Sequence, residues 1–147
     1  MNFVVGIDPG TKGGIAVLDD SGGVVWTKAF RPDMTLVEFV EDVGAALDTN
    51  PRGVFLEKVG HKRGDGSRGS FTFGGAMRAA EIALLSHGVK PKYVPPVFWQ
   101  ARLECLSGGD KSVTLRRAKE LFGNQVKVTH GIADALLIAE YGRRCLA

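Results

Sequence analysis

The chain has 147 residues, of which 44% are hydrophobic and 24% charged, and its formal net charge is +3. This length and composition indicate one globular domain, residues 1–147, with a substantial core. The mild positive charge is compatible with a polyanionic partner but does not require one. Because no stretch reaches membrane-spanning length and no basic leader precedes the first apolar run, we expect no membrane partner and a cytoplasmic location, in a bacterial or phage-infected host cytosol.

The first patterned stretch is an apolar, β-branched run over residues 3–7, which predicts a buried strand. Pro9-Gly10 predicts a tight turn in which the glycine accepts a positive φ, and a second strand follows up to Leu18. Gly13-Gly14 would let a backbone or a phosphate approach closely. Asp8 stands between the strand and the turn, where its carboxylate is partly desolvated. It either bonds its own backbone in the turn or binds a metal ion.

The next elements complete a meander and begin a crossover. Residues 19–23 predict a turn and residues 24–30 a third strand, so the first three strands are expected to be antiparallel. Thr35 is a candidate cap for a helix whose apolar residues recur at helical spacing. Asn50-Pro51 ends that helix.

A second strand-end carboxylate follows this helix. Residues 53–59 predict a strand that carries Glu57, and a strand–helix–strand crossover favours parallel pairing with the first strand. Asp8 and Glu57 are then expected side by side at one edge of the sheet. Residues 60–70 are basic and glycine-rich, which predicts a mobile loop beside Glu57.

The second half of the chain predicts mostly helices. Residues 71–87 predict a helix that ends at Gly88, and its many glycines and alanines permit close packing, either within the chain or against a second copy. Residues 92–94 predict the last strand, which Pro95-Pro96 stops. Further helices are predicted over residues 97–106, over the basic segment 110–122, and from 129 or 130 to 144.

Two polar residues of the last predicted helix complete a possible site. His130 and Asp134 are four residues apart, so they project from nearly the same face. Singly, Asp134 could stabilise the helix N-terminus and His130 could be a capping or surface residue. Together with Asp8 and Glu57 they suggest another reading, because three acids at one sheet edge repel unless cations neutralise them. Oxygen ligands with one possible imidazole suit Mg²⁺ or Mn²⁺, and two such ions can clamp a phosphodiester.

Three motifs occur in order across nearly the whole chain: Gly6-Ile7-Asp8-Pro9-Gly10, Leu56-Glu57-Lys58, and the run from His130 to Ala139. Together they resemble RuvC-type Holliday-junction resolvases, the crossover junction endodeoxyribonucleases, and most of all their short phage and organellar branch. The resemblance implies an α/β, ribonuclease H-like fold with a five-stranded mixed sheet flanked by helices. It also implies a homodimer that resolves four-way branched DNA by paired, Mg²⁺-dependent nicks.

The resemblance also implies roles for single residues. Asp8 and Glu57 correspond to the first two catalytic acids and Asp134 to the last, holding two Mg²⁺ ions for which Mn²⁺ can substitute. His130 falls where many relatives have an aspartate, so it either binds metal or assists the attacking water. Lys111 falls where the family often places a basic residue near the scissile phosphate. The residues expected to contact DNA are Lys12, Lys58, Lys62, Arg63, Arg68, Phe71, Phe73 and Arg116.

Phe71 and Phe73 resemble the aromatic residues that enter the junction centre, although they could equally pack in the core at a helix start.

Three other interpretations of the chain stay open. Residues 6–11 also fit the phosphate-binding turn of the sugar-kinase and actin superfamily, but those proteins need two lobes and 147 residues supply one, so no nucleotide cofactor is expected. A non-catalytic junction-binding module would gain nothing from acids that repel phosphate. A ribonuclease H-like nuclease that acts on RNA or other branched DNA is the third alternative.

Overall fold

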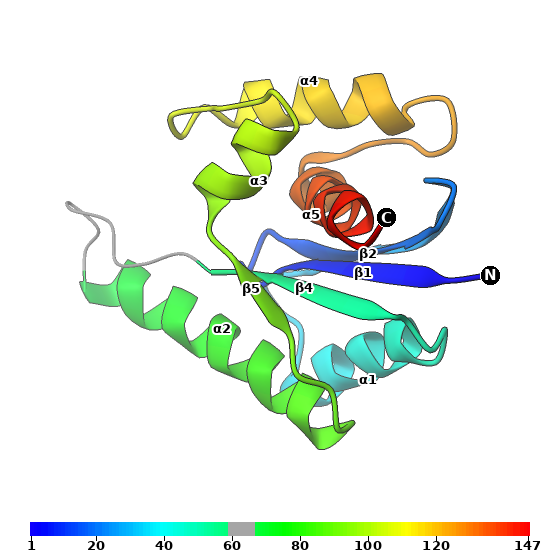
Figure 1. Ribbon diagram of the computed structural model, residues 1–147. Helices are drawn as coiled ribbons and strands as arrows, with labels where there is room; N and C mark the ends of the chain where they lie inside the picture. The colour runs from blue at the N-terminus through cyan, green and yellow to red at the C-terminus, as the bar shows by residue number, and fades with distance from the viewer. Residues whose placement is uncertain (59–66) are drawn as a thin grey trace.

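The computed structural model describes residues 1–58 and 67–147, with residues 67–74 described as backbone only. Five strands form one mixed sheet in the order β3-β2-β1-β4-β5, and helices cover both of its faces (Figure 1). The strands are β1 (Phe3–Asp8), β2 (Gly14–Asp19), β3 (Val24–Ala29), β4 (Gly53–Glu57) and β5 (Lys92–Val94). The predicted α/β class and five-stranded mixed sheet are confirmed.

The pairing of the strands follows the prediction from their order. β1, β2 and β3 form an antiparallel meander, whereas β4 pairs with β1 in parallel and β5 pairs with β4 in parallel. Successive residues of β1 point to opposite faces, so Val4 joins one hydrophobic cluster and Val5 the other. Both faces of the central strands are buried, which explains their continuous apolar sequence.

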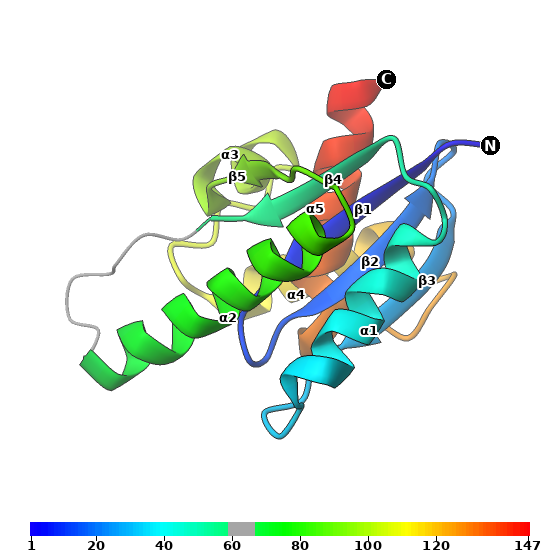
Figure 2. The same cartoon turned by 90° about the horizontal axis from the view of Figure 1, so that it is seen from below.

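Two helices cover the first face of the sheet, α1 (Leu36–Leu47) and α2 (Ser67–Ser86) (Figure 2). Thr35 caps α1 as predicted, and its side chain and that of Glu38 each bond the other residue's backbone amide. The predicted start of α2 at residue 71 was wrong, because the helix already begins at Ser67. Its glycine content resembled that of a loop, but packing of its later turns against α1 and the sheet supports a longer helix.

The second face carries α3 (Pro96–Arg102), α4 (Lys111–Phe122) and α5 (His130–Leu146). α5 lies directly on β1, where a Cβ atom added at Gly6 would come within 2.3 Å of the Ala139 nitrogen. Glycine at this position therefore fixes how closely the helix approaches the sheet.

α3 ends at Arg102, so the predicted extension to residue 106 was wrong. Beyond the helix Glu104 has a φ of 60°, which breaks helical geometry and lets Leu103 and Cys105 both turn inward to the core. In the part of the chain that the structure describes, no helix combines the length and the apolarity needed to cross a membrane.

Candidate active site

Asp8 is the last residue of β1, and its side chain is buried at the edge of the sheet. Its Oδ1 accepts a hydrogen bond from the Gly10 amide at 3.2 Å, so the turn interaction considered from sequence is present. The turn closes through the Gly13 amide, which donates to the Gly10 carbonyl at 2.9 Å. Gly10 does not have the predicted positive φ. Gly13 is needed for a different reason, because a Cβ there would lie 2.8 Å from the Asp8 carboxyl carbon.

Glu57 ends β4 beside Asp8, because Ile7 and Leu56 are partners in the parallel β1–β4 ladder. The predicted juxtaposition of the two strand-end acids is therefore confirmed. Glu57 is buried, and its Oε2 accepts a hydrogen bond from the Trp99 indole nitrogen at 2.8 Å. Trp99 belongs to α3 and is fully buried. Sequence reasoning missed this contact because 42 residues separate the two partners.

Asp134 comes from the second turn of α5 and is also buried. Its Oδ2 accepts a 2.9 Å hydrogen bond from the ammonium of Lys111, the first residue of α4. The Lys111 side chain is 71% exposed, so its stem reaches in from solvent to the buried carboxylate. The structure thus brings Lys111 and the three predicted acids together, each from a different element.

The charges of this cluster are not balanced. Burial raises the pKa of Asp8 to about 6, and the charge of Asp134 adds to this rise, whereas the Gly10 amide and Lys111 oppose it. Burial also raises the pKa of Glu57 to about 8, aided by the charges of Asp8 and Asp134. Partial burial lowers the pKa of Lys111, but its interactions with Asp134 and the other two acids together raise it above the ordinary value. Among the described residues, one ammonium is therefore shared among three carboxyl groups.

The chemistry of these donors fits a hard divalent cation, since they are buried carboxylates and the described residues supply only one positive charge among them. Their present arrangement is not a finished metal cage. Within residues 1–58 and 67–147, no three histidine, cysteine, aspartate or glutamate side chains are grouped so that they could hold an ion. The Lys111 ammonium occupies one oxygen of Asp134 instead.

His130 stands apart from the three acids. It is the first residue of α5, one turn before Asp134, and it is exposed. In the described part of the chain, no side-chain hydrogen bond or ion pair links it to Asp8, Glu57 or Asp134. Its exposed position agrees with a capping or surface role for His130, one of the alternatives considered from sequence.

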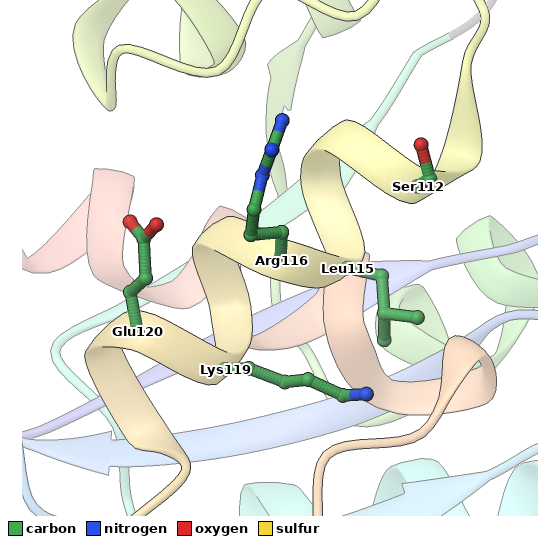
Figure 3. Close-up of a pocket in the computed structure, with 5 residues that line it drawn as sticks. All are labelled: Ser112, Leu115, Arg116, Lys119 and Glu120. Carbon is green, nitrogen blue, oxygen red and sulfur yellow. The ribbon is translucent and has the colours of Figure 1, made fainter.

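The residues predicted to contact DNA fall into three groups. Lys12, Lys58 and Arg116 are exposed, and the Lys58 ammonium lies 5.6 Å from the centroid of the Tyr93 ring. Arg116 projects outward from α4 beside an open hollow of about 500 Å³ (Figure 3). Ser112, Leu115, Arg116, Lys119 and Glu120 line this hollow. Lys62 and Arg63 lie outside the described residues, and only the backbone is described for Arg68, Phe71 and Phe73.

A fourth buried acid, Glu140, lies further along α5 and was not singled out from the sequence. Only 4% of Glu140 is exposed, and two arginines surround its carboxylate. Arg143 donates to both of its oxygens at 2.8 and 2.9 Å, and Arg144 donates at 2.7 Å. Burial alone would raise the pKa of Glu140, but these hydrogen bonds and charges bring it below the ordinary value. Arginines at positions +3 and +4 from an acid on a helix were a visible signal for this pairing.

Comparison with known proteins identifies the fold of the chain. No protein-family model and no curated relative matches the sequence. Among solved structures, RuvC of T. thermophilus in complex with a Holliday-junction substrate aligns with a TM-score of 0.69 and 22% identity, covering 99% of this chain and 96% of that one. A second Thermus thermophilus RuvC structure aligns with a TM-score of 0.68 and 20% identity, covering 97% of this chain and 96% of that one. The chain therefore has the ribonuclease H-like fold of RuvC, as the sequence motifs predicted.

Proposed function

We propose that this protein is a Holliday-junction resolvase, an endonuclease that makes paired, symmetric nicks in four-way DNA junctions. The observation that carries the proposal is the buried, under-neutralised group of Asp8, Glu57 and Asp134, at the carboxyl ends of β1 and β4 and the start of α5. Its support from comparison is the shared fold with RuvC, one structure of which holds a Holliday-junction substrate. Its place of action would be the cytosol.

We propose Mg²⁺ as the cofactor, with Mn²⁺ as a substitute and two ions per site, held by the three acids. When bound, such ions supply a water nucleophile at neutral pH and stabilise charge on the leaving oxygen. The acids would reach this state when the exposed Lys111 side chain leaves Asp134, so that its ammonium becomes free to contact the scissile phosphate. His130, which is exposed one turn before Asp134, would either assist the attacking water or join the ligands.

The proposed DNA-contacting surface surrounds this site. Lys12 follows Asp8 in the first turn, Lys58 follows Glu57, and Arg116 and Lys119 stand on the outer face of α4. Exposed cations of this kind give sequence-independent contacts with a phosphate backbone, which suits recognition of a branched structure. The other five predicted DNA contacts, Lys62, Arg63, Arg68, Phe71 and Phe73, have no described side chains and stay predictions from the sequence.

Paired nicks require two sites, and we propose that a homodimer supplies them through α2. The alanines of α2 suggested this helix as an interface. However, Ala80 and Ala83 face inward and pack in the core of the same chain. The outer side of α2 instead exposes Ile82 and Leu85, at 60% and 57%. Apolar side chains of this size on one helix face are suited to packing against a second copy. A monomer by light scattering, both free and with a junction bound, would remove this part of the proposal.

The function is tested with purified protein and a panel of labelled substrates: a four-way junction, a nicked and an intact duplex, single-stranded DNA, RNA and an RNA–DNA hybrid. Each is incubated with Mg²⁺, Mn²⁺ or chelator. A resolvase cleaves the junction in preference to all linear substrates. Preference for RNA or for the hybrid would favour the related nuclease instead, and junction binding without any cleavage would favour a binding module.

A further inference from the structure

Among the described residues, each acid of the candidate active site is held by one donor, and only one of the three donors is charged. Asp8 is held by the backbone amide of Gly10, and Asp134 by the ammonium of Lys111. Glu57 is held by the indole of Trp99. The Trp99 contact is the only one of the three that uses a neutral side chain.

The position of Trp99 follows from the pairing of β4 and β5. Val94, the end of β5, is the ladder partner of Glu57, and its carbonyl accepts a hydrogen bond from the Lys58 amide at 2.9 Å. Two prolines follow, with Pro95 as the cap and Pro96 as the first residue of α3. Their fixed φ angles start the helix immediately beyond Glu57. The first turn of α3 then directs the Trp99 side chain back to the Glu57 carboxylate, which lies beside the end of β5.

The burial of Trp99 in the core also indicates that its indole nitrogen has a specific role. Trp99 is fully buried in the cluster formed with α5, whereas the neighbouring Phe98 is 62% exposed. An indole N–H can only donate, so burying it requires an acceptor, which an apolar side chain in the same space would not need. The acceptor used here is one oxygen of a candidate metal ligand rather than a backbone carbonyl.

This hydrogen bond would fix the orientation of Glu57. With Oε2 engaged by a rigid, fully packed ring, the carboxyl group cannot rotate freely, and Oε1 has no protein donor among the described residues. A neutral donor orients the carboxylate without competing for its charge, in contrast to the lysine on Asp134. Glu57 therefore keeps one oxygen directed and available for a ligand.

We propose that Trp99 is a positioning residue for Glu57, whose indole N–H holds one carboxylate oxygen so that the other is presented to a divalent cation. This inference rests on the proposed function for the identity of the ligand. The alternative is an ordinary core tryptophan that happens to satisfy its N–H on a nearby acid. The two differ in what happens when only the N–H is removed.

Trp99→Phe keeps an aromatic ring in the core and removes the donor. We expect the Mg²⁺ concentration at the midpoint of thermal stabilisation to rise about 10- to 100-fold, as is common when a group that orients a metal ligand is lost. The cleavage rate constant at saturating junction should fall by a similar factor, while junction affinity in chelator changes less than about twofold. Leu103→Ala, which removes a fully buried side chain from the same cluster, is the structural control. It should lower the melting temperature and leave the Mg²⁺ midpoint unchanged.

The chain has two tryptophans, so fluorescence gives a second readout that does not depend on cleavage. In Trp26→Phe, where Trp99 is the sole emitter, Mg²⁺ should change the emission spectrum, and the added Glu57→Gln should abolish that change. An unaltered Mg²⁺ midpoint in a folded Trp99→Phe, or no emission response in Trp26→Phe, would overturn the proposal. An emission response in a protein that cleaves no substrate would instead defeat the proposed function and keep the positioning role. If Trp99→Phe does not fold, the emission experiment still tests the proposal, because the absence of a response would overturn it.

Discussion

Helix α5 carries two buried acids whose negative charges are balanced to very different extents. Glu140 is enclosed by Arg143 and Arg144, and the pKa of its carboxyl falls below the ordinary value. Asp134 belongs to a group of three acids that share one lysine among the described residues, and the pKa values of Asp8 and Glu57 are raised. Burial alone therefore does not mark a functional acid. A shortage of positive charge among the described residues is the more informative feature, and it is the basis on which we propose a cation at this group.

The largest expected effect comes from removing a charge of the under-neutralised group. Asp8→Asn should lower junction cleavage by about a thousandfold or more, since an acid that holds the reacting groups contributes to every step of hydrolysis. Junction affinity should be retained or slightly increased, because one negative charge near the phosphates is lost. Single-turnover cleavage and a binding titration in chelator measure the two effects. Asp48→Asn, at an exposed helix end, is the matched control and should behave as wild type.

The second prediction compares the two groups by the same chemical change. Glu140→Gln should destabilise the protein by about 2 kcal/mol, because it leaves two arginines without their shared carboxylate; both reach solvent, which limits the cost. Glu57→Gln should cost much less at pH 7 in chelator, since a carboxyl with a pKa of about 8 is already mostly protonated there. Denaturant unfolding of the two variants in parallel measures the difference. Equal losses of stability would contradict the distinction between the groups.

The third prediction concerns pH. Because the folded protein raises the pKa of Asp8 to about 6 and of Glu57 to about 8, it binds these protons more tightly than the unfolded chain does. Their contribution to stability is present at low pH and is lost as the pH rises through these values. Glu140, with its lowered pKa, works in the other direction and loses stabilisation in the acid range. Melting temperatures in chelator should thus fall between about pH 5 and pH 9, and Mg²⁺ should restore them more at the upper end. A melting temperature that stays constant as the pH rises through this range would show that the charges of the acids are already balanced by the protein.

The smallest effect on stability is expected from Lys111→Met. The ion pair with Asp134 is formed by a largely exposed lysine, so its loss should cost about 1 kcal/mol or less in chelator. The variant should gain more melting temperature from saturating Mg²⁺ than the wild type, since no ammonium then competes for Asp134. Thermal unfolding with and without Mg²⁺ measures both quantities. A smaller Mg²⁺ response than in wild type would mean that the lysine helps rather than competes.

Local patterns in the sequence predicted most of the sheet and the position of the acids. The β-branched run before Asp8, the cap at Thr35 and the crossover into β4 are all local signals, and their combination was enough to bring Asp8 and Glu57 together. Local signals failed where packing overrode them. The early start of α2 contradicts its glycine content, and the end of α3 depends on which residues reach the core.

The partners of the acids were harder to predict than the acids themselves. The Trp99–Glu57 hydrogen bond spans 42 residues and the Lys111–Asp134 pair spans 23, so neither has a periodic signature. The close backbone approach predicted at Gly13 is present, whereas Gly10 lacks the positive φ that its turn position suggested. Sequence could therefore locate the acids, whereas the orientation of their carboxyl groups depends on contacts that only the folded chain brings about.

The most direct test of the proposed function is single-turnover cleavage of a four-way junction labelled in turn on each strand, measured across a Mg²⁺ titration. We expect no cleavage in chelator, saturable activation by Mg²⁺, and nicks at symmetric positions in two opposing strands. Cleavage that persists in chelator, or an intact junction at saturating Mg²⁺ with protein that binds it, would contradict the claim that this acid group is a metal-dependent nuclease site.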